Sequence, residues 1–305
     1  MLTNAFSLAP DAINWLAKTR QPRVLHVFDS ACNLINERRE VLSIVTPQIG
    51  NGPFNLVLED EVCFSEHLRF ESKVSVSPTQ LYLGDLTIYT AKANIWSPHP
   101  NWETLRDNRD TTVNQLMKLS VINDQVRGLD TGFVITQPYS TTVIDPKLPI
   151  TSYKPSNSLV SSLFSAFANG DISGAKEITS KLAGLGSGLT PAGDDIIMGA
   201  IYAAWIIHPF TVASVLAQEI ANTAALRTTS LSAAWLRSAG KGEAGILWHK
   251  FFDALISVGR IAYPTYLQEA IGNILSVGET SGADALAGFF GTMTAWAALP
   301  HPKTP

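Results

Sequence analysis

The apolar residues of this chain follow two different patterns, and that change is the strongest constraint on its fold. Up to about residue 150, short stretches rich in β-branched and aromatic residues lie between turn residues, at 24–28, 41–45, 54–58 and 132–136. Such stretches predict strands. Later segments have helical spacing, as at Leu247, Phe251 and Leu255. We therefore predict an α+β fold. A mostly antiparallel, β-rich half would occupy residues 1–150, and an all-helical half residues 151–305.

Several elements within these halves can be placed in advance. The segment 81–90 alternates around a Gly-Asp pair, which indicates a strand pair or a bulged strand. Helices are expected at 11–19 and 111–119. The segment 136–158 contains four prolines and is typical of a linker or an extended crossing segment.

Composition excludes several classes of protein. The charged fraction is 16% and the hydrophobic fraction 46%, which excludes a disordered chain. The net charge is −4 and the sequence has no basic runs, so it lacks the basic stretches that are typical of nucleic-acid-binding proteins. The longest apolar run, Ile196–Ile207, is well short of the ~20 residues of a membrane span and predicts a buried helix. Cys32 and Cys63 are expected to be buried free thiols, with a single disulfide as the alternative. Without a signal peptide pattern, the expected location is cytoplasmic.

The segment GLGSGLTPAGDD, from Gly184 to Asp195, is the most distinctive motif. Thr190 as N-cap and Pro191 at the first helical position would start a helix over 191–207. Asp194 and Asp195 would then lie in or beside its first turn, where the helix dipole favours negative charge. Helix capping alone explains much of this pattern. The alternating glycines before it favour a second interpretation, in which main-chain N–H groups face an anion.

This turn differs from the common phosphate-binding loops. Asp194 stands where a Walker loop has lysine, and the third glycine does not fit a dinucleotide fingerprint. A second segment, GETSGADALAGFFG from Gly278 to Gly291, repeats the pattern about 90 residues later. It aligns Thr280 with Thr190 and Asp284 with Asp194. Two similar caps can arise by chance; the sharper hypothesis is that both helix N-termini converge on one site.

Such a site would combine anion-binding amides with carboxylates. Magnesium could bridge aspartates and an anionic substrate; alternatively, the aspartates could accept hydrogen bonds from a ureido group while amides hold its acidic end. Two arginines, Arg227 and Arg237, are candidates for binding a carboxylate or phosphate. Thr228, Thr229 and Ser230 either cap a helix beginning at Leu231 or contact the ligand, with capping expected for at least one. The candidate catalytic residues are Asp194, Asp195 and Asp284. The candidate substrate-binding and anion-binding residues are Gly186, Ser187, Gly188, Leu189, Thr190, Arg227, Thr229, Ser230, Arg237, Thr280, Ser281 and Gly282.

In the N-terminal half, the turn GNGPFN (Gly50 to Asn55) is interpreted as a plain hairpin turn. This turn and the two glycine motifs resemble the domain-of-unknown-function family that includes AllH, a subunit of the oxamate carbamoyltransferase of allantoin breakdown. The resemblance spans about residues 32–293 and is strongest in the C-terminal half. The matching motif positions are Gly186, Gly188, Thr190, Pro191, Asp194, Asp195, Thr280, Ser281, Gly282 and Asp284.

The resemblance implies carbamoyl transfer in purine catabolism, in which oxalurate and phosphate give oxamate and carbamoyl phosphate, or a related reaction of another ureido acid. It also implies partners, namely an FdrA-type protein and a further subunit, and it carries over no catalytic residue. Three hypotheses follow. The chain is a catalytic or substrate-binding subunit of such a complex, a non-catalytic docking subunit of it, or a magnesium-dependent hydrolase of a small anion.

Overall fold

The computed structural model describes residues 1–77, 79–118, 159–257 and 263–300. These residues form two compact units. One consists of Met1–His99 with Glu243–Ile246, and the other of Pro100–Gly242 with Leu247–Pro305. The strand predicted at 132–136, the segment 136–158 and the domain boundary at residue 150 lie outside the described residues, so they stay predictions.

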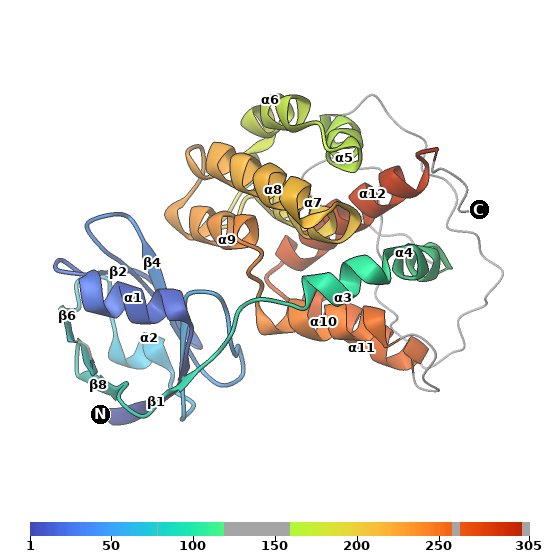
Figure 1. Cartoon of the computed structure of the whole chain (residues 1–305). Helices are drawn as coiled ribbons and strands as arrows, with labels where there is room; N and C mark the ends of the chain where they lie inside the picture. The colour runs from blue at the N-terminus through green and yellow to red at the C-terminus, as the bar shows by residue number, and fades with distance from the viewer. Residues whose placement is uncertain (78, 119–158, 258–262, 301–305) are drawn as a thin grey trace. The chain divides into compact units, whose positions relative to one another are not determined.

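The first unit is a nine-stranded sheet with strand order β2-β3-β4-β5-β1-β8-β7-β6, and β9 pairs with β1 (Figure 1). Its strands are β1 (Leu2–Leu8), β2 (Arg23–Val27), β3 (Ala31–Ile35), β4 (Val41–Val45), β5 (Asn55–Leu58), β6 (Val74–Ser77), β7 (Gln80–Leu83), β8 (Leu86–Tyr89) and β9 (Asn94–Ile95). Two helices accompany them, α1 (Pro10–Lys18) and α2 (Phe64–His67). Most neighbouring strands are antiparallel, as predicted; β1–β8, β1–β9 and β4–β5 are parallel.

The local predictions for this unit are confirmed to within about a residue. The stretches 24–28, 41–45 and 54–58 become β2, β4 and β5, and the helix predicted at 11–19 is α1. The segment 81–90 is a strand pair, because β7 and β8 pair antiparallel with Leu83 opposite Leu86. Of the two alternatives predicted for this segment, the strand pair is therefore confirmed.

The turn GNGPFN is not a hairpin turn, which corrects the sequence interpretation. It leads from β4 to β5, and these strands run parallel, with Ile44 opposite Leu56. The connection must therefore cross over instead of folding back. Gly50, with φ 77°, makes the bend. The Asn51 carbonyl accepts a hydrogen bond from the N–H of Ile246 at 2.9 Å, which anchors the later segment Glu243–Ile246 in this unit.

The core of the first unit packs Trp15 and Leu16 of α1 against the inner sheet residues, among them Leu34, Leu42 and Leu56. Cys32 belongs to this core, and burial raises the pKa of its thiol to about 12. Both cysteines are free, as expected, but Cys63 is only half-buried, which corrects that part of the prediction.

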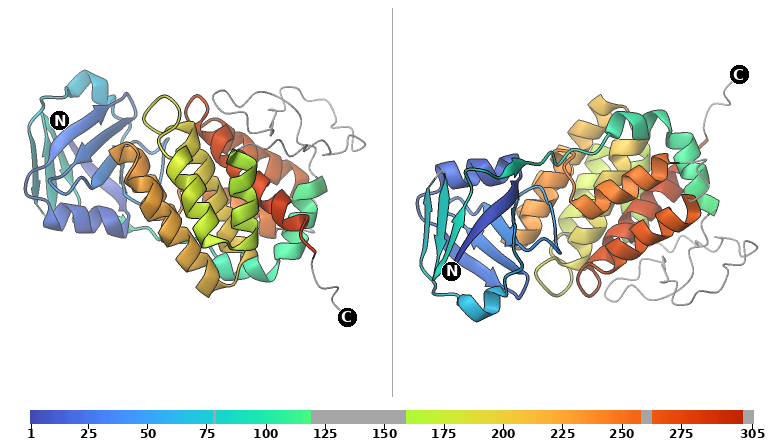
Figure 2. Two further views of the ribbon diagram at one scale, coloured as in Figure 1. Left: turned by 90° about the horizontal axis from the view of Figure 1, so that it is seen from above. Right: turned by 90° about the horizontal axis from the view of Figure 1, so that it is seen from below.

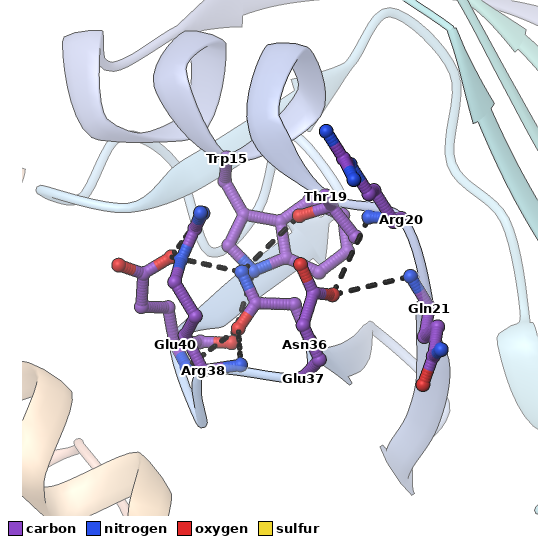
Figure 3. Close-up of polar contacts among 8 residues, drawn as sticks. All are labelled: Trp15, Thr19, Arg20, Gln21, Asn36, Glu37, Arg38 and Glu40. Carbon is purple, nitrogen blue, oxygen red and sulfur yellow. Dashed lines mark hydrogen bonds and ion pairs between the residues drawn. The ribbon is translucent and has the colours of Figure 1, made fainter.

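The β3–β4 turn is held by Asn36, whose side chain is buried (Figure 3). Its Oδ1 accepts hydrogen bonds from the N–H groups of Arg38 and Glu40, at 3.0 and 2.9 Å. Its Nδ2 donates to Thr19 Oγ1 at 3.2 Å and to Glu40 Oε2 at 2.8 Å. The Trp15 indole donates to the Glu40 carbonyl at 2.9 Å. One amide side chain thus joins the turn to the end of α1.

We predict that Asn36→Ala lowers the free energy of unfolding of the chain by about 2–3 kcal/mol, because buried partners lose their hydrogen bonds. Arg38→Ala is the matched control. It removes only the Arg38–Glu40 ion pair of 2.8 Å, whose side chains are both exposed, and should change little. Urea unfolding measures both variants; equal effects would contradict this role of Asn36.

The second unit contains only helices among its described elements. They are α3 (Trp102–Asp107), α4 (Arg109–Lys118), α5 (Leu159–Asn169), α6 (Ile172–Leu182), α7 (Ala192–Ile207), α8 (Phe210–Ala225), α9 (Ser230–Gly240), α10 (Ile246–Ile256), α11 (Tyr263–Leu275) and α12 (Ser281–Ala297). The helix predicted at 111–119 corresponds to α4. The run Ile196–Ile207 is buried within α7, as predicted. In Figure 1, α5 and α6 lie above α7 and α12, and α10 and α11 lie below them.

Helices α7 and α12 pack with their main chains in contact. A Cβ atom on Gly199 would lie 1.8 Å from the Ala285 carbonyl oxygen, and one on Gly288 would lie 2.0 Å from that of Ile196. Aromatic rings fill the space beside them. Trp248 and Phe251 of α10 lie 5.8 and 5.3 Å from Phe289 of α12, measured between ring centroids. No side chain larger than hydrogen fits at either glycine.

Gly288→Ala should lower the free energy of unfolding by more than about 4 kcal/mol, because the added methyl group would force the two main chains apart. Gly272→Ala in α11 is the control: a Cβ atom there meets nothing within 4 Å. Helix propensity should make that variant more stable by about 0.5–1 kcal/mol. Thermal and urea unfolding of the full chain compare them, and a tolerated Gly288→Ala would contradict the packing described here.

Candidate functional site

The first glycine motif leads into α7, but the helix does not begin as predicted. Its first residue is Ala192, and Pro191, with ψ 142°, occupies the N-cap position without a side-chain cap. The predicted cap at Thr190 is wrong because the Thr190 hydroxyl is engaged elsewhere, 2.7 Å from the Ser281 hydroxyl. Asp194 and Asp195 do lie in the first turn of α7, as predicted.

The three alternating glycines all have positive φ angles, which residues with a side chain rarely adopt. Gly184, Gly186 and Gly188 have φ values of 77°, 118° and 96°. A Cβ atom on Gly186 would lie 2.7 Å from the main-chain nitrogen of Ala192, whereas one on Gly188 would meet nothing within 4 Å. Within the described part of the chain, the main-chain N–H groups of residues 186–190 donate no hydrogen bond. Main-chain N–H groups without partners in a turn of this kind are the donors that anion-binding concavities use.

Asp194 holds the N-terminal end of this loop in place. Its carboxylate accepts hydrogen bonds from the Gly184 N–H at 2.8 Å, from Ser232 Oγ at 2.7 Å and from the Thr228 hydroxyl. The loop's other end is fixed by Thr229, whose hydroxyl donates to the Leu189 carbonyl at 2.5 Å. Thr229 also caps α9, as expected for one of these hydroxyl residues. Residues at the start of α9 therefore fix both ends of the glycine loop, one directly and one through Asp194.

The second motif starts α12 beside the first. Thr280 is its N-cap residue, and Asp284 lies in its first turn. A Cβ atom on Gly282 would lie 1.8 Å from the Ile274 carbonyl oxygen, so this turn also packs against main chain. Both views in Figure 2 show the loop before α7 and the loop before α12 side by side. The structure therefore brings the two helix N-termini together, as the sharper hypothesis predicts.

Asp195 and Asp284 lie in the first turns of α7 and α12 and are both buried, and we refer to them as the carboxyl pair. Their exposed fractions are 5% and 0%. Among the described residues, Asp195 Oδ2 and both carboxyl oxygens of Asp284 find no hydrogen-bond partner. Burial raises the pKa of Asp195 well above its ordinary value, and the charges of Asp284 and Asp194 add to this, against the hydroxyls of Ser281 and Thr190. Burial raises the pKa of Asp284 to about 7, against the nearby Thr280 hydroxyl.

Several other predicted residues are exposed or belong to α9. Ser187 is exposed in the glycine loop. Ser230 is the first residue of α9. Arg227 is exposed, and Arg237 is exposed in the last turn of α9, the end away from Thr229. Neither arginine acts on the pKa of Asp195 or Asp284.

Sequence reasoning missed Ser232. Its hydroxyl binds Asp194, and its main-chain N–H, at 3.1 Å, receives the Thr229 cap. The run of hydroxyl residues from Thr228 to Ser232 was the available signal. Among the residues that the structure describes, no three His, Cys, Asp or Glu side chains are grouped as metal ligands, the aspartates of α7 and α12 included.

The free energy of unfolding should depend on pH through the buried carboxyl of Asp284. Its pKa is about 7 in the folded chain and 3.8 without the fold, so within that window the folded state keeps a proton that the unfolded state has lost. The contribution of Asp284 to the free energy of unfolding should therefore fall as pH rises from about 5 to about 7, by roughly 2 kcal/mol, and level off above. Urea unfolding of wild type and Asp284→Asn measures this. The variant should lose the part of the decline that Asp284 causes and keep the part that the raised pKa of Asp195 causes, while exposed Asp253→Asn should keep both; an unchanged decline in Asp284→Asn would contradict the assignment.

Comparison with known protein families agrees with these motifs. A model described as the AllH family N-terminal domain matches residues 4–95, and one described as oxamate carbamoyltransferase subunit AllH matches residues 182–293. No solved structure matches the chain. In the described part of the chain, every helix is too short or too polar to cross a membrane. Because the two family matches together cover most of its length, the chain belongs to the AllH family of oxamate carbamoyltransferase subunits.

Proposed function

We propose that this chain forms the substrate-binding and catalytic site of a carbamoyltransferase complex that acts on a ureido acid. The glycine loop would hold an anion, either phosphate or the acidic end of the ureido acid, through the N–H groups of residues 186–190. Asp195 and Asp284 would face the carbamoyl group. The favoured reaction is that of oxalurate with phosphate, giving oxamate and carbamoyl phosphate.

The observation that carries this proposal is the buried carboxyl pair without partners. Three carboxyl oxygens, Asp195 Oδ2 and both oxygens of Asp284, lack hydrogen bonds from the part of the chain that the structure describes. Unpartnered buried polar groups are costly and are concentrated where a ligand completes them. A carbamoyl group has N–H donors for such oxygens.

The main requirement of this reaction is a proton transfer, because phosphate itself is the nucleophile. An oxygen of hydrogen phosphate attacks the terminal carbamoyl carbon of oxalurate, and the bond from that carbon to the oxamate nitrogen breaks. The proton lost by phosphate ends on the leaving nitrogen, so atoms and charge balance. A carboxyl whose pKa is near 7, as at Asp284, can take and return such a proton. Asp194 would act as a positioning residue, because its oxygens are occupied by Gly184, Thr228 and Ser232.

The proposal includes partners and a location. The AllH description names a subunit, so further chains are expected, of which an FdrA-type protein and an additional subunit are the candidates. The expected location is the cytoplasm, where phosphate and carbamoyl phosphate are available.

A second candidate function is a docking subunit whose glycine turn only packs helices. The contacts of Asp194 favour it, since they bind the loop to α9 without any ligand. Under this alternative the chemistry would be performed by the partner chains alone.

The test assays carbamoyl phosphate formation from oxalurate and phosphate by the assembled complex. Asp195→Asn and Asp284→Asn should each lower kcat by about 100-fold or more, because neither amide can relay the proton. Asp253→Asn, on the exposed side of α10, is the control and should match wild type. Wild-type kcat in both pair variants would overturn the catalytic proposal and favour the docking subunit.

A further inference from the structure

The sheet of the first unit has one face on the core and one face that meets solvent over β1, β8 and β7. Ala5, Ile88 and Leu81, one from each of these strands, belong to the core. Successive side chains of a strand point to opposite faces, so the neighbouring positions point outward. The outward side chains include four large apolar or aromatic ones, Leu2, Phe6, Tyr82 and Tyr89, with exposed fractions of 69%, 53%, 44% and 39%.

The strand register joins these side chains into one surface. Leu2 of β1 pairs with Thr87 of β8, and Thr87 pairs with Tyr82 of β7. Tyr89 of β8 pairs with Asn4 of β1. Side chains of paired residues lie about 5 Å apart, and residues two positions apart along a strand lie about 7 Å apart. We call this surface the outer patch, and it consists of Leu2, Phe6, Tyr82 and Tyr89.

The composition of the outer patch is that of an interface. Outward positions of a sheet with one solvent-facing side are usually polar. Contiguous exposed apolar side chains mark sites of interaction, and aromatic side chains are enriched in protein interfaces. The Tyr82 hydroxyl donates a hydrogen bond to Gln80 Oε1 at 2.5 Å, which restrains the ring before a partner binds.

Acidic side chains border the outer patch on the β1 side and at the β7–β8 turn. The Glu59 carboxylate accepts a hydrogen bond from Asn4 Nδ2 at 3.0 Å, so it lies next to the outward row of β1. Glu59 begins an exposed run of three acids, with Asp60 and Glu61. Asp85, in the β7–β8 turn, is also exposed, and its carbonyl accepts a hydrogen bond from the N-terminal amine at 2.7 Å. Asp85 therefore lies beside the start of β1.

Lysines near the outer patch are fewer than these acids. Lys73 precedes β6, where its carbonyl accepts a hydrogen bond from the Gly84 N–H at 3.0 Å, and Lys92 follows β8; both are exposed. A second copy of this chain would bring the same excess of acids against the patch, and like charges oppose contact. A partner that surrounds an apolar centre with lysine or arginine has the complementary charge.

The outer patch belongs to the unit that holds none of the proposed site residues. Those residues, from Gly186 to Asp284, lie in the second unit. The family model for the N-terminal domain matches residues 4–95, separately from the model that covers the glycine motifs. A subunit requires a surface for its complex, and a surface on the first unit leaves the glycine motifs available to substrate.

We propose that the outer patch docks a partner chain of the complex, whose apolar centre packs on Phe6, Tyr82 and Tyr89 and whose lysine or arginine side chains face the acids that begin at Glu59. The inference rests on the part of the proposed function that gives this chain partners, and it is independent of the proposed chemistry. Aromatic side chains at the centre of an interface contribute most of the affinity, while charges at its rim set the association rate and the salt dependence.

The first test is calorimetry of the full chain with the FdrA-type protein and with the additional subunit, each purified. Phe6→Ala and Tyr89→Ala should each weaken the binding of one of these partners by about 30-fold or more, as for other central aromatic residues. Phe210→Ala removes a ring of α8 whose exposed fraction, 60%, is similar, and this matched control should bind as wild type does. Wild-type affinity in both patch variants, or binding of wild type to neither partner, would overturn the proposal.

The charge of the partner is tested by salt and by charge reversal. The affinity of wild type should fall roughly 10-fold between about 0.05 M and about 0.5 M salt. Glu59→Lys should weaken binding at low salt, whereas Asp253→Lys, at an exposed position of α10, should not. An affinity that changes neither with salt nor in Glu59→Lys would refute the basic border of the partner.

Measurements on the lone chain separate the other possible occupants. Because the patch side chains are exposed, Phe6→Ala and Tyr89→Ala should keep the wild-type midpoint of urea unfolding. A clearly lower midpoint would show that the chain itself covers the patch. Light scattering that finds a dimer of wild type but a monomer of Phe6→Ala would assign the patch to a second copy. Either result would overturn the proposal.

The carbamoyl phosphate assay distinguishes this inference from the proposed reaction. Patch variants that assemble and turn over as wild type does would refute the docking surface and leave the reaction standing. Loss of assembly in the patch variants, together with an assembled wild-type complex that forms no carbamoyl phosphate, would support the docking surface and overturn only the reaction.

Discussion

The contact between the main chains of α7 and α12 is the constraint on which the helical unit depends. Gly199 and Gly288 allow it, because each faces a carbonyl oxygen of the other helix at a distance that excludes a methyl group. The N-terminal ends of these two helices also lie together, as the contact between the Thr190 and Ser281 hydroxyls shows. The two glycine motifs, about 90 residues apart in sequence, thereby become a single junction at which Thr190 meets Ser281. The site is thus a consequence of helix packing.

The same contact gives two adjacent aspartates opposite roles. Asp194 faces α9, where Ser232, Thr228 and the Gly184 N–H use its oxygens. Asp195 faces α12, where it meets a second carboxyl and no cation. Successive residues of a helix point about 100° apart, so neighbours in a first turn meet different elements. The helix dipoles favour negative charge at both termini, but burial outweighs this for Asp195 and Asp284.

Local features of the fold were predictable because they depend on local sequence. Apolar patterns placed β2, β4, α1 and the β7–β8 hairpin, and the repeated Gly-x-Thr and aspartate spacing anticipated the junction. Long-range partners were not predictable in this way. The turn at Gly50–Asn55 has hairpin residues, yet the parallel pairing of β4 with β5 is decided by the rest of the sheet. Thr190 has the residue type of a cap, but Ser281 competes for its hydroxyl. The function of Ser232 depends on where α9 packs.

A glycine loop suited to anions lies beside carboxyls that have no counter-charge in the part of the chain that the structure describes. The two elements conflict only for a ligand that carries the same charge at both of its ends. In a lysine-bearing phosphate loop, a cation neutralises the ligand. Here the main-chain N–H groups of residues 186–190 offer partial positive charge, while Asp195 and Asp284 add acceptors that no donor among the described residues satisfies. A simple anion satisfies the first half and is repelled by the second. A molecule with an acidic end and a neutral N–H-bearing end would satisfy both, which is why we propose a ureido acid as the substrate.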